Sequence, residues 1–249
     1  MRRGFQAAAE RLAGEVRTEL RLDYDDRFDP LVLADAYGVP VASITELVAH
    51  GADPASIHQL TIVDRGCFSA GTVFVGTSRL IVYNPSHSDR RLANSISHEL
   101  SHLVLEHVPG PAIGPGGCRV WDKEVEDEAD TLAGMLLVTR DAALACARVG
   151  LPHPIGAARF GVSTELMRWR TDHSGAARQA QAAARNRGKV IPSLSAAGQR
   201  QLPRVAELEW LADLSAAQWR TVLAECRGAL VAGTVHQLNV VVTTPVAVR

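Results

Sequence analysis

The chain has 249 residues, 47% hydrophobic and 21% charged, so it is long enough to bury a globular core and is not disordered throughout. A formal net charge of −1 excludes a general electrostatic attraction to nucleic acid or anionic lipid. Four scattered cysteines without a C-x-x-C pair favour reduced thiols, and no apolar run approaches the ~20 residues of a membrane span, so we expect a soluble cytoplasmic protein with no membrane partner.

The first third of the chain combines helical periodicity with short β-rich runs. Apolar residues at helical spacing predict an amphipathic first helix. Asp29 and Pro30 are typical of a helix start, as N-cap and first-turn residue. Runs rich in Val, Ile and Thr, separated by Gly, Asp and Ser, predict a small sheet of hairpin-connected strands. The expected elements are helices over 4–21 and 30–36 and strands over 39–44, 59–64, 71–76 and 79–84.

The remainder of the chain reads as helical, which together with the small sheet predicts an α+β fold. A run of prolines and glycines predicts an irregular loop near residues 109–117. An Ala/Arg-rich stretch, 176–190, contains no acid and is interpreted as a solvated helix or linker, with a basic contact surface as the alternative. The expected helices cover 89–106, 122–138, 139–148, 154–160, 163–172 and two within 203–232, and 238–242 is β-prone.

The most informative stretch is HELSHLVLEH, at residues 98–107. His98 and His102 are four residues apart, which places both imidazoles on one face of a helix, and with Glu99 they form an H-E-x-x-H array. Imidazole nitrogen suits Zn²⁺, and two histidines leave room for a third protein ligand and a water. The helical phase predicts that the histidines lie opposite the apolar face, among Asn94, Ser97 and Ser101. We therefore predict one zinc ion per chain, with Glu99 as the catalytic base.

The third zinc ligand is expected from the helix over residues 122–138. Glu126 lies at the edge of that helix's apolar stripe, whereas Glu128 is predicted to point away from it, so Glu126 is the preferred ligand and Glu128 the fallback. An inward carboxylate is costly unless it is paired or bound to metal. Asp130, on the same face as Glu126, is expected to hydrogen-bond the non-ligating nitrogen of one histidine and to fix its tautomer.

Three other residues near the motif, Tyr83, His87 and His107, are considered for further roles. The metzincin arrangement would need Gly and His where the chain has Leu105 and Val108, so His107 is not predicted to be a ligand. It is placed on the apolar side of its own helix and interpreted as a packed or surface-bridging histidine. A donor for the oxyanion of an acyl-transfer reaction is also expected, and Tyr83, His87 and His107 are the candidates near the motif in sequence.

Four stretches resemble the ImmA/IrrE family of zinc metallopeptidases, over roughly residues 1–175. The resemblance implies a small α+β metallopeptidase domain with zinc ligands His98, His102 and Glu126 and the base Glu99. It also implies cleavage of a helix-turn-helix transcriptional repressor, which would relieve repression in stress, phage or mobile-element responses. The resembling stretches are RRGFQAAAERLAGEVRTEL, RLIVYNPSHSDRRLANSISHELSHLVLEH, EDEADTLAGMLLV and FGVSTELMRWR.

Two alternatives to a protease follow from the same sequence. Residues 154–172 read as two short helices with a glycine-containing turn, so a DNA-binding regulator that uses Arg168 and Arg170 is possible, although direct DNA binding is not favoured. A non-catalytic zinc scaffold that binds a protein partner is the other, but such a site would not need Glu99. The expected domains are a metallopeptidase domain at 1–175, a linker or helix at 176–202 and an extension of unknown role at 203–249.

Overall fold

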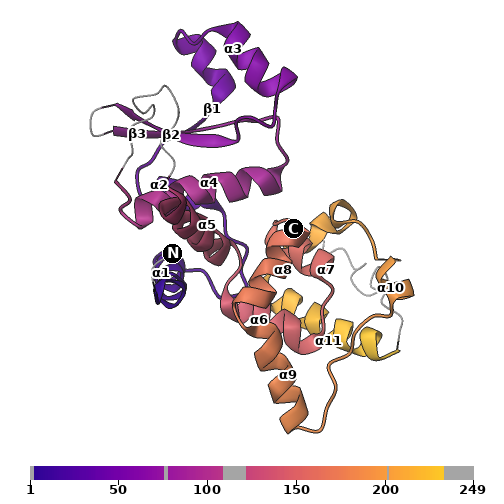
Figure 1. The fold of residues 1–249 in the computed structure, drawn as a ribbon. Coiled ribbons are helices and arrows are strands. Elements are labelled where there is room, and N and C mark those ends of the chain that lie inside the picture. Colours follow the sequence, from indigo (N-terminus) through magenta and orange to yellow (C-terminus); the bar gives the residue numbers. More distant parts are fainter. Residues whose placement is uncertain (1–2, 76–77, 109–121, 201, 233–249) are drawn as a thin grey trace, which may run out of the picture. The chain divides into compact units, whose positions relative to one another are not determined.

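A computed structural model of the chain describes residues 3–75, 78–108, 122–200 and 202–232. Helices dominate this part of the chain, and its single small sheet is formed by residues between 41 and 83, so the α+β prediction is confirmed (Figure 1). The chain divides into two compact units. Unit 1 contains residues 1–22 and 28–137, and unit 2 contains residues 23–27 and 138–249. The predicted domain limits at 175 and 202 stay predictions.

Unit 1 is built around a three-stranded mixed sheet with the order β1-β3-β2. The short strand β1 (Val41–Ser43) runs parallel to β3 (Ser78–Tyr83), and β2 (Ala70–Val75) runs antiparallel to it. One face of the sheet packs on the turn η1 (Ile44–His50) and helix α3 (Pro54–His58), through Ile44, Ile57 and Val82. The described sheet thus has β2 as an outer strand.

The expected strand at residues 59–64 is wrong. Residues Gln59–Val63 form the π-helical turn η2 directly after α3. Asp53 starts this helical run, because its carboxylate accepts hydrogen bonds from the backbone of Ala55 and Ser56 at 3.2 and 3.0 Å. The Thr61 hydroxyl donates to the Ile57 carbonyl at 2.8 Å inside the same run. Local capping therefore overrides the β propensity of Thr-Ile-Val.

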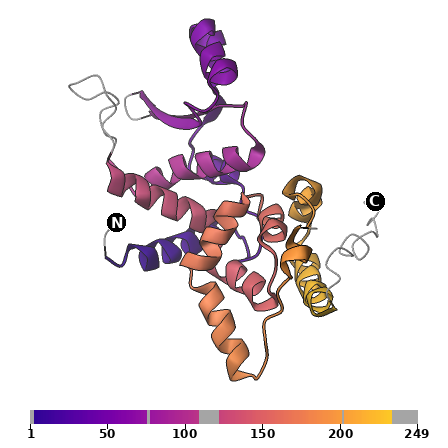
Figure 2. The same ribbon diagram turned by 45° about the vertical axis from the view of Figure 1, so that its right-hand side comes forward.

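The other face of the sheet packs on α4 (Asp89–Val104), the helix that carries the H-E-x-x-H motif. Helix α5 (Lys123–Leu137) lies beside α4 in both views (Figures 1 and 2). Helix α1 (Phe5–Glu19) packs on α5, and α2 (Pro30–Ala36) packs on α4. The predicted cap of α2 is confirmed, since the Asp29 side chain accepts a hydrogen bond from the Leu31 amide at 2.9 Å. Unit 1 thus has a helical layer on the face of the sheet opposite η1 and α3.

The secondary-structure elements in the described part of unit 2 are all helices, joined by turns and irregular segments. The predicted helices at 139–148, 154–160 and 163–172 are confirmed, and the Ala/Arg-rich stretch forms a helix with Ala176, Ala180 and Ala184 buried on one side. The elements are α6 (Arg140–Val149), α7 (His153–Phe160), α8 (Thr164–His173), α9 (Ala176–Asn186), α10 (Ala196–Arg200), the 3-10 helix η3 (Val205–Asp213) and α11 (Ala216–Ala232).

Buried polar side chains tie the C-terminal helices into unit 2. Arg159, 1% exposed, donates to the Asp25 and Ala212 carbonyls at 2.8 and 3.1 Å. Arg220 from α11 makes two hydrogen bonds to the buried Asp25 carboxylate, at 2.9 and 3.0 Å. The fully buried Trp219 packs edge-on against the Phe160 ring. The 3-10 helix η3 and helix α11 therefore contribute buried side chains to this unit's core.

The irregular loop near residues 109–117 and the β-prone stretch at 238–242 lie outside the described residues. Among the described helices, none is long and apolar enough to cross a membrane.

Candidate metal centre

Helix α4 presents His98 and His102 from the same side, as the spacing of four predicts. Their rings meet edge to face with centroids 4.8 Å apart. The predicted polar surroundings are only partly right, because Ser97 and Ser101 are fully buried. The Ser101 hydroxyl donates to the Ser97 carbonyl at 2.7 Å, which satisfies a polar group inside the helix interface. The buried face of α4 therefore includes the two serines, which the sequence pattern placed on the polar side. The histidines lie at the border between the buried and the exposed faces.

Glu126 of α5 completes a three-residue cluster with the two histidines. His98 Nε2 lies 3.1 Å from both Glu126 Oε2 and His102 Nε2, and His102 Nε2 lies 3.6 Å from Glu126 Oε2. Ligand atoms about 2.0–2.1 Å from a tetrahedral zinc would lie about 3.4 Å from one another. The three side chains are 15–23% exposed, which leaves the cluster open on one side. These residues could hold a metal ion, and their separations fit one of zinc's size.

Asp130, one turn beyond Glu126, lies against the other nitrogen of His98. Its Oδ1 is 2.7 Å from His98 Nδ1. Burial alone lowers the pKa of His98, but the hydrogen bond and negative charge of Asp130 outweigh it, so this pKa lies above its ordinary value. Burial and the neighbouring His98 keep the pKa of His102 below its ordinary value. The two histidines thus share one cluster but have different electrostatic surroundings.

His107 occupies a place that the sequence interpretation missed. Helix α4 ends at Val104, and Glu106 adopts a left-handed conformation with φ 54°. His107 therefore lies outside the helix and not on its apolar side, where the sequence pattern placed it. Its amide donates to the His102 carbonyl at 2.9 Å, which folds the chain back. As a result His107 Nδ1 lies 2.9 Å from His102 Nδ1.

Glu128 is placed on the far side of His107, and the prediction that it points away from the packed side of α5 is wrong. Its residue is 3% exposed, and Oε2 lies 3.5 Å from His107 Nε2. The physical reason is the folded-back end of α4, which covers a part of α5 that the sequence pattern assigned to solvent. Glu128 therefore contacts the histidine behind the cluster, and Glu126 is the carboxylate that joins the cluster itself.

Glu99 is held by a residue from the sheet. The Thr72 hydroxyl of β2 donates to Glu99 Oε2 at 2.7 Å. This contact connects the outer strand with the H-E-x-x-H helix, and no sequence pattern indicates it, because β2 and α4 are separated by β3 and a turn. Thr72 therefore fixes one oxygen of the carboxylate next to the two histidines.

The three candidates for an oxyanion donor are placed differently. His107 lies behind His102, as described above. His87 Nε2 lies 3.1 Å from the Phe68 carbonyl and 3.4 Å from Ser69 Oγ. This ring nitrogen therefore contacts the two residues that precede β2. Tyr83 ends β3, opposite Ala70. The choice among Tyr83, His87 and His107 as oxyanion donor stays a prediction.

An H-E-x-x-H helix joined by a glutamate from the next helix is the arrangement of a metallopeptidase. Residues 61–172 match the peptidase family described as the IrrE N-terminal-like domain, Peptidase_M78. The resemblance drawn from the sequence is thus confirmed, and this part of the chain is a metallopeptidase domain of the ImmA/IrrE type, a class that implies a protein substrate. No curated protein and no solved structure gives a significant match to the chain.

Proposed function

We propose that this protein is a zinc-dependent endopeptidase with a narrow range of substrates. The observation that supports it best is the triangle of His98, His102 and Glu126, with Glu99 held beside it by Thr72. A bound zinc ion would acidify a water molecule and polarise the scissile carbonyl. Glu99 is the base: it accepts the proton of the attacking water and passes it to the departing amine.

Strand β2 offers a way to position the substrate. In the described sheet it is one of the two outer strands, so an extended peptide can pair with it by main-chain hydrogen bonds. Thr72 lies on this strand and contacts Glu99. Val73 and Phe74, the next two residues, are 46% and 43% exposed and would provide apolar contacts for the peptide. Strand pairing would therefore bring a peptide bond to the base.

We further propose that the substrate is a helix-turn-helix transcriptional repressor, whose cleavage relieves repression in stress, phage or mobile-element responses. This proposal rests on the ImmA/IrrE type of the domain. The protein would cut a loop or a helix-connecting segment and would leave casein-like unfolded proteins intact.

The structure argues against the DNA-binding alternative, because one of the two arginines it requires is not accessible. Helices α7 and α8 form as predicted, but Arg170 is fully buried and its Nε donates to the Val138 carbonyl at 2.7 Å. A buried guanidinium cannot contact a DNA base or phosphate. Arg168, which is exposed, would have to act without it.

Incubation of the zinc-loaded protein with candidate repressors, next to Glu99→Gln, tests the proposed function. Glu99→Gln keeps the size of the side chain and removes the base, so zinc content should stay the same while cleavage falls by about 10²–10⁴. A duplex-DNA titration on the same preparation tests the alternative. Sequence-specific DNA binding without cleavage of any repressor would refute the protease, and zinc binding without cleavage would indicate a scaffold.

A further inference from the structure

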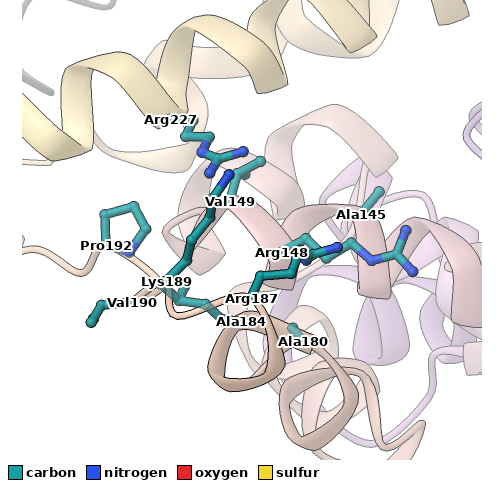
Figure 3. A pocket seen from close by; sticks show the side chains of 11 residues that line it. Ala145, Arg148, Val149, Ala180, Ala184, Arg187, Lys189, Val190, Pro192 and Arg227 are labelled. Carbon is teal, nitrogen blue, oxygen red and sulfur yellow. The ribbon is translucent and has the colours of Figure 1, made fainter. Parts of the chain in front are cut away.

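Unit 2 contains a pocket that the metal centre does not use (Figure 3). Its volume is about 420 Å³, within the range of sites for small organic molecules. It is bordered by α6, α9, the segment that follows α9, and α11. Four of its lining residues are cations, and within the described part of the chain none is acidic. The cations are Arg148, Arg187, Lys189 and Arg227.

The cations come from three parts of unit 2, which are α6, the segment after α9, and α11, and they meet at this pocket. In Figure 3 the charged end of Lys189 points toward that of Arg227, although the two residues come from different parts of the fold. No ion pair among the described residues engages any of the four. Like charges brought together without an anion repel one another, so an anionic ligand would gain from all of them.

Helix ends account for only part of this charge. Helices α6 and α9 end at Val149 and Asn186, so their C-termini flank the pocket and attract cations. Each C-terminus is equivalent to about half a negative charge, and two of them offset about one positive charge. About three of the four positive charges therefore remain for a ligand.

The backbone of the pocket wall is closely fitted. Gly150 has φ +74°, and a Cβ added there would lie 1.9 Å from the Pro192 carbonyl oxygen. Only glycine therefore lets the segment around Pro192 lie this close to the end of α6. The Lys189 amide donates to the Ala184 carbonyl at 2.8 Å, which fixes the turn that presents its side chain. Val190, Ile191 and Pro192 add apolar surface to the same wall.

We propose that this pocket binds a small organic phosphate that carries two or more negative charges. Guanidinium groups match phosphate oxygens with paired hydrogen bonds, and the lysine adds a point charge. The apolar wall suits the organic part of such a molecule, which inorganic phosphate lacks. A concave site of this volume favours a small molecule over the backbone of a nucleic acid, which would need an extended surface.

Binding of ADP, AMP and inorganic pyrophosphate to the full chain, measured by titration calorimetry at two salt concentrations, tests the proposal. We expect ADP to bind more tightly than pyrophosphate. Arg187→Gln and Lys189→Gln should each weaken ADP binding by about tenfold or more, the size expected for one charge-assisted hydrogen bond. Arg185→Gln is the matched control, because Arg185 is exposed in the last turn of α9, next to the pocket segment, but does not line the pocket.

Gly150→Ala provides a second test that changes no charge. It should weaken ADP binding by displacing residues 190–192, provided that circular dichroism shows a folded protein. Equal binding of ADP to all four variants and to the unchanged protein would overturn the proposal, as would no binding of the three probes at low salt. Duplex-DNA binding that depends on Arg187 and Lys189, without ADP binding, would assign the cations to a nucleic-acid surface instead.

Discussion

The Asp130 carboxylate lies 2.7 Å from His98 Nδ1, on the opposite side of the ring from the nitrogen that faces Glu126. This contact favours the tautomer that carries its proton on Nδ1 and leaves the Nε2 lone pair for a metal. A residue on α5 thus orients a ring on α4.

Asp130→Ala should therefore weaken zinc binding without removing any ligand. We expect a loss of about 10–100-fold in affinity, the usual effect of removing such a partner. Competition with a zinc-binding dye would measure it. Asp127→Ala is the control, since that carboxylate is on the same helix but pairs with Lys123 at 2.7 Å. An unchanged affinity in Asp130→Ala would show that solvent replaces this contact.

Glu126→Gln should have a larger effect, because it removes a ligand. Zinc content after dialysis should fall well below one per chain, and far-UV circular dichroism should show α5 intact. Glu124→Gln, at an exposed position on the same helix, should keep its zinc. Full zinc content in Glu126→Gln would mean that the carboxylate near the histidines is not a ligand.

His107 and Glu128 should support His102 from behind. The His102 Nδ1 proton can be donated to His107 Nδ1, and His107 Nε2 then faces Glu128. His107→Phe should keep the packing but remove the acceptor, with a loss of about tenfold or more in zinc affinity. In the cobalt-substituted protein the absorption spectrum should change as well. A spectrum and an affinity identical to those of the unchanged protein would reduce His107 to a packing residue.

Thr72→Val should separate catalysis from metal binding. The substitution removes the hydroxyl that Glu99 accepts at 2.7 Å, so kcat should fall while zinc affinity stays the same. Thr72→Ser keeps the hydroxyl and should restore most of the activity. If Thr72→Val lowered zinc affinity instead, the strand would be needed for the shape of the metal cluster.

Trp219→Ala should test how unit 2 is held together. The side chain is fully buried and contacts Phe160, so its loss should cost about 3–5 kcal/mol of unfolding free energy. Denaturant titration monitored by circular dichroism would measure this change. A loss below about 1 kcal/mol would mean that the C-terminal helices contribute little to the stability of this unit.

The sequence predicted those features that depend on local spacing and capping. The helix with His98 and His102 and the choice of Glu126 next to the histidines follow from helical phase, and the start of α2 at Asp29 follows from the N-cap signal. Contacts between elements distant in the sequence could not be predicted from local patterns. Thr72 contacts Glu99 only because β2 packs on α4. Glu128 was misplaced because Glu106 reverses the chain with a left-handed backbone, which no residue preference indicates, since glycine is the usual residue there.

The segment at residues 23–27 limits how the protein can be divided. The chain enters unit 2 for these five residues, returns to unit 1, and enters unit 2 again after residue 137. Asp25 in this segment is fully buried and receives the hydrogen bonds of Arg220, near the end of the described chain. A protein shortened after residue 175 would keep the buried carboxylate and lose its arginine. We therefore expect loss of the C-terminal helices to destabilise the segment at residues 23–27, only a few residues before α2.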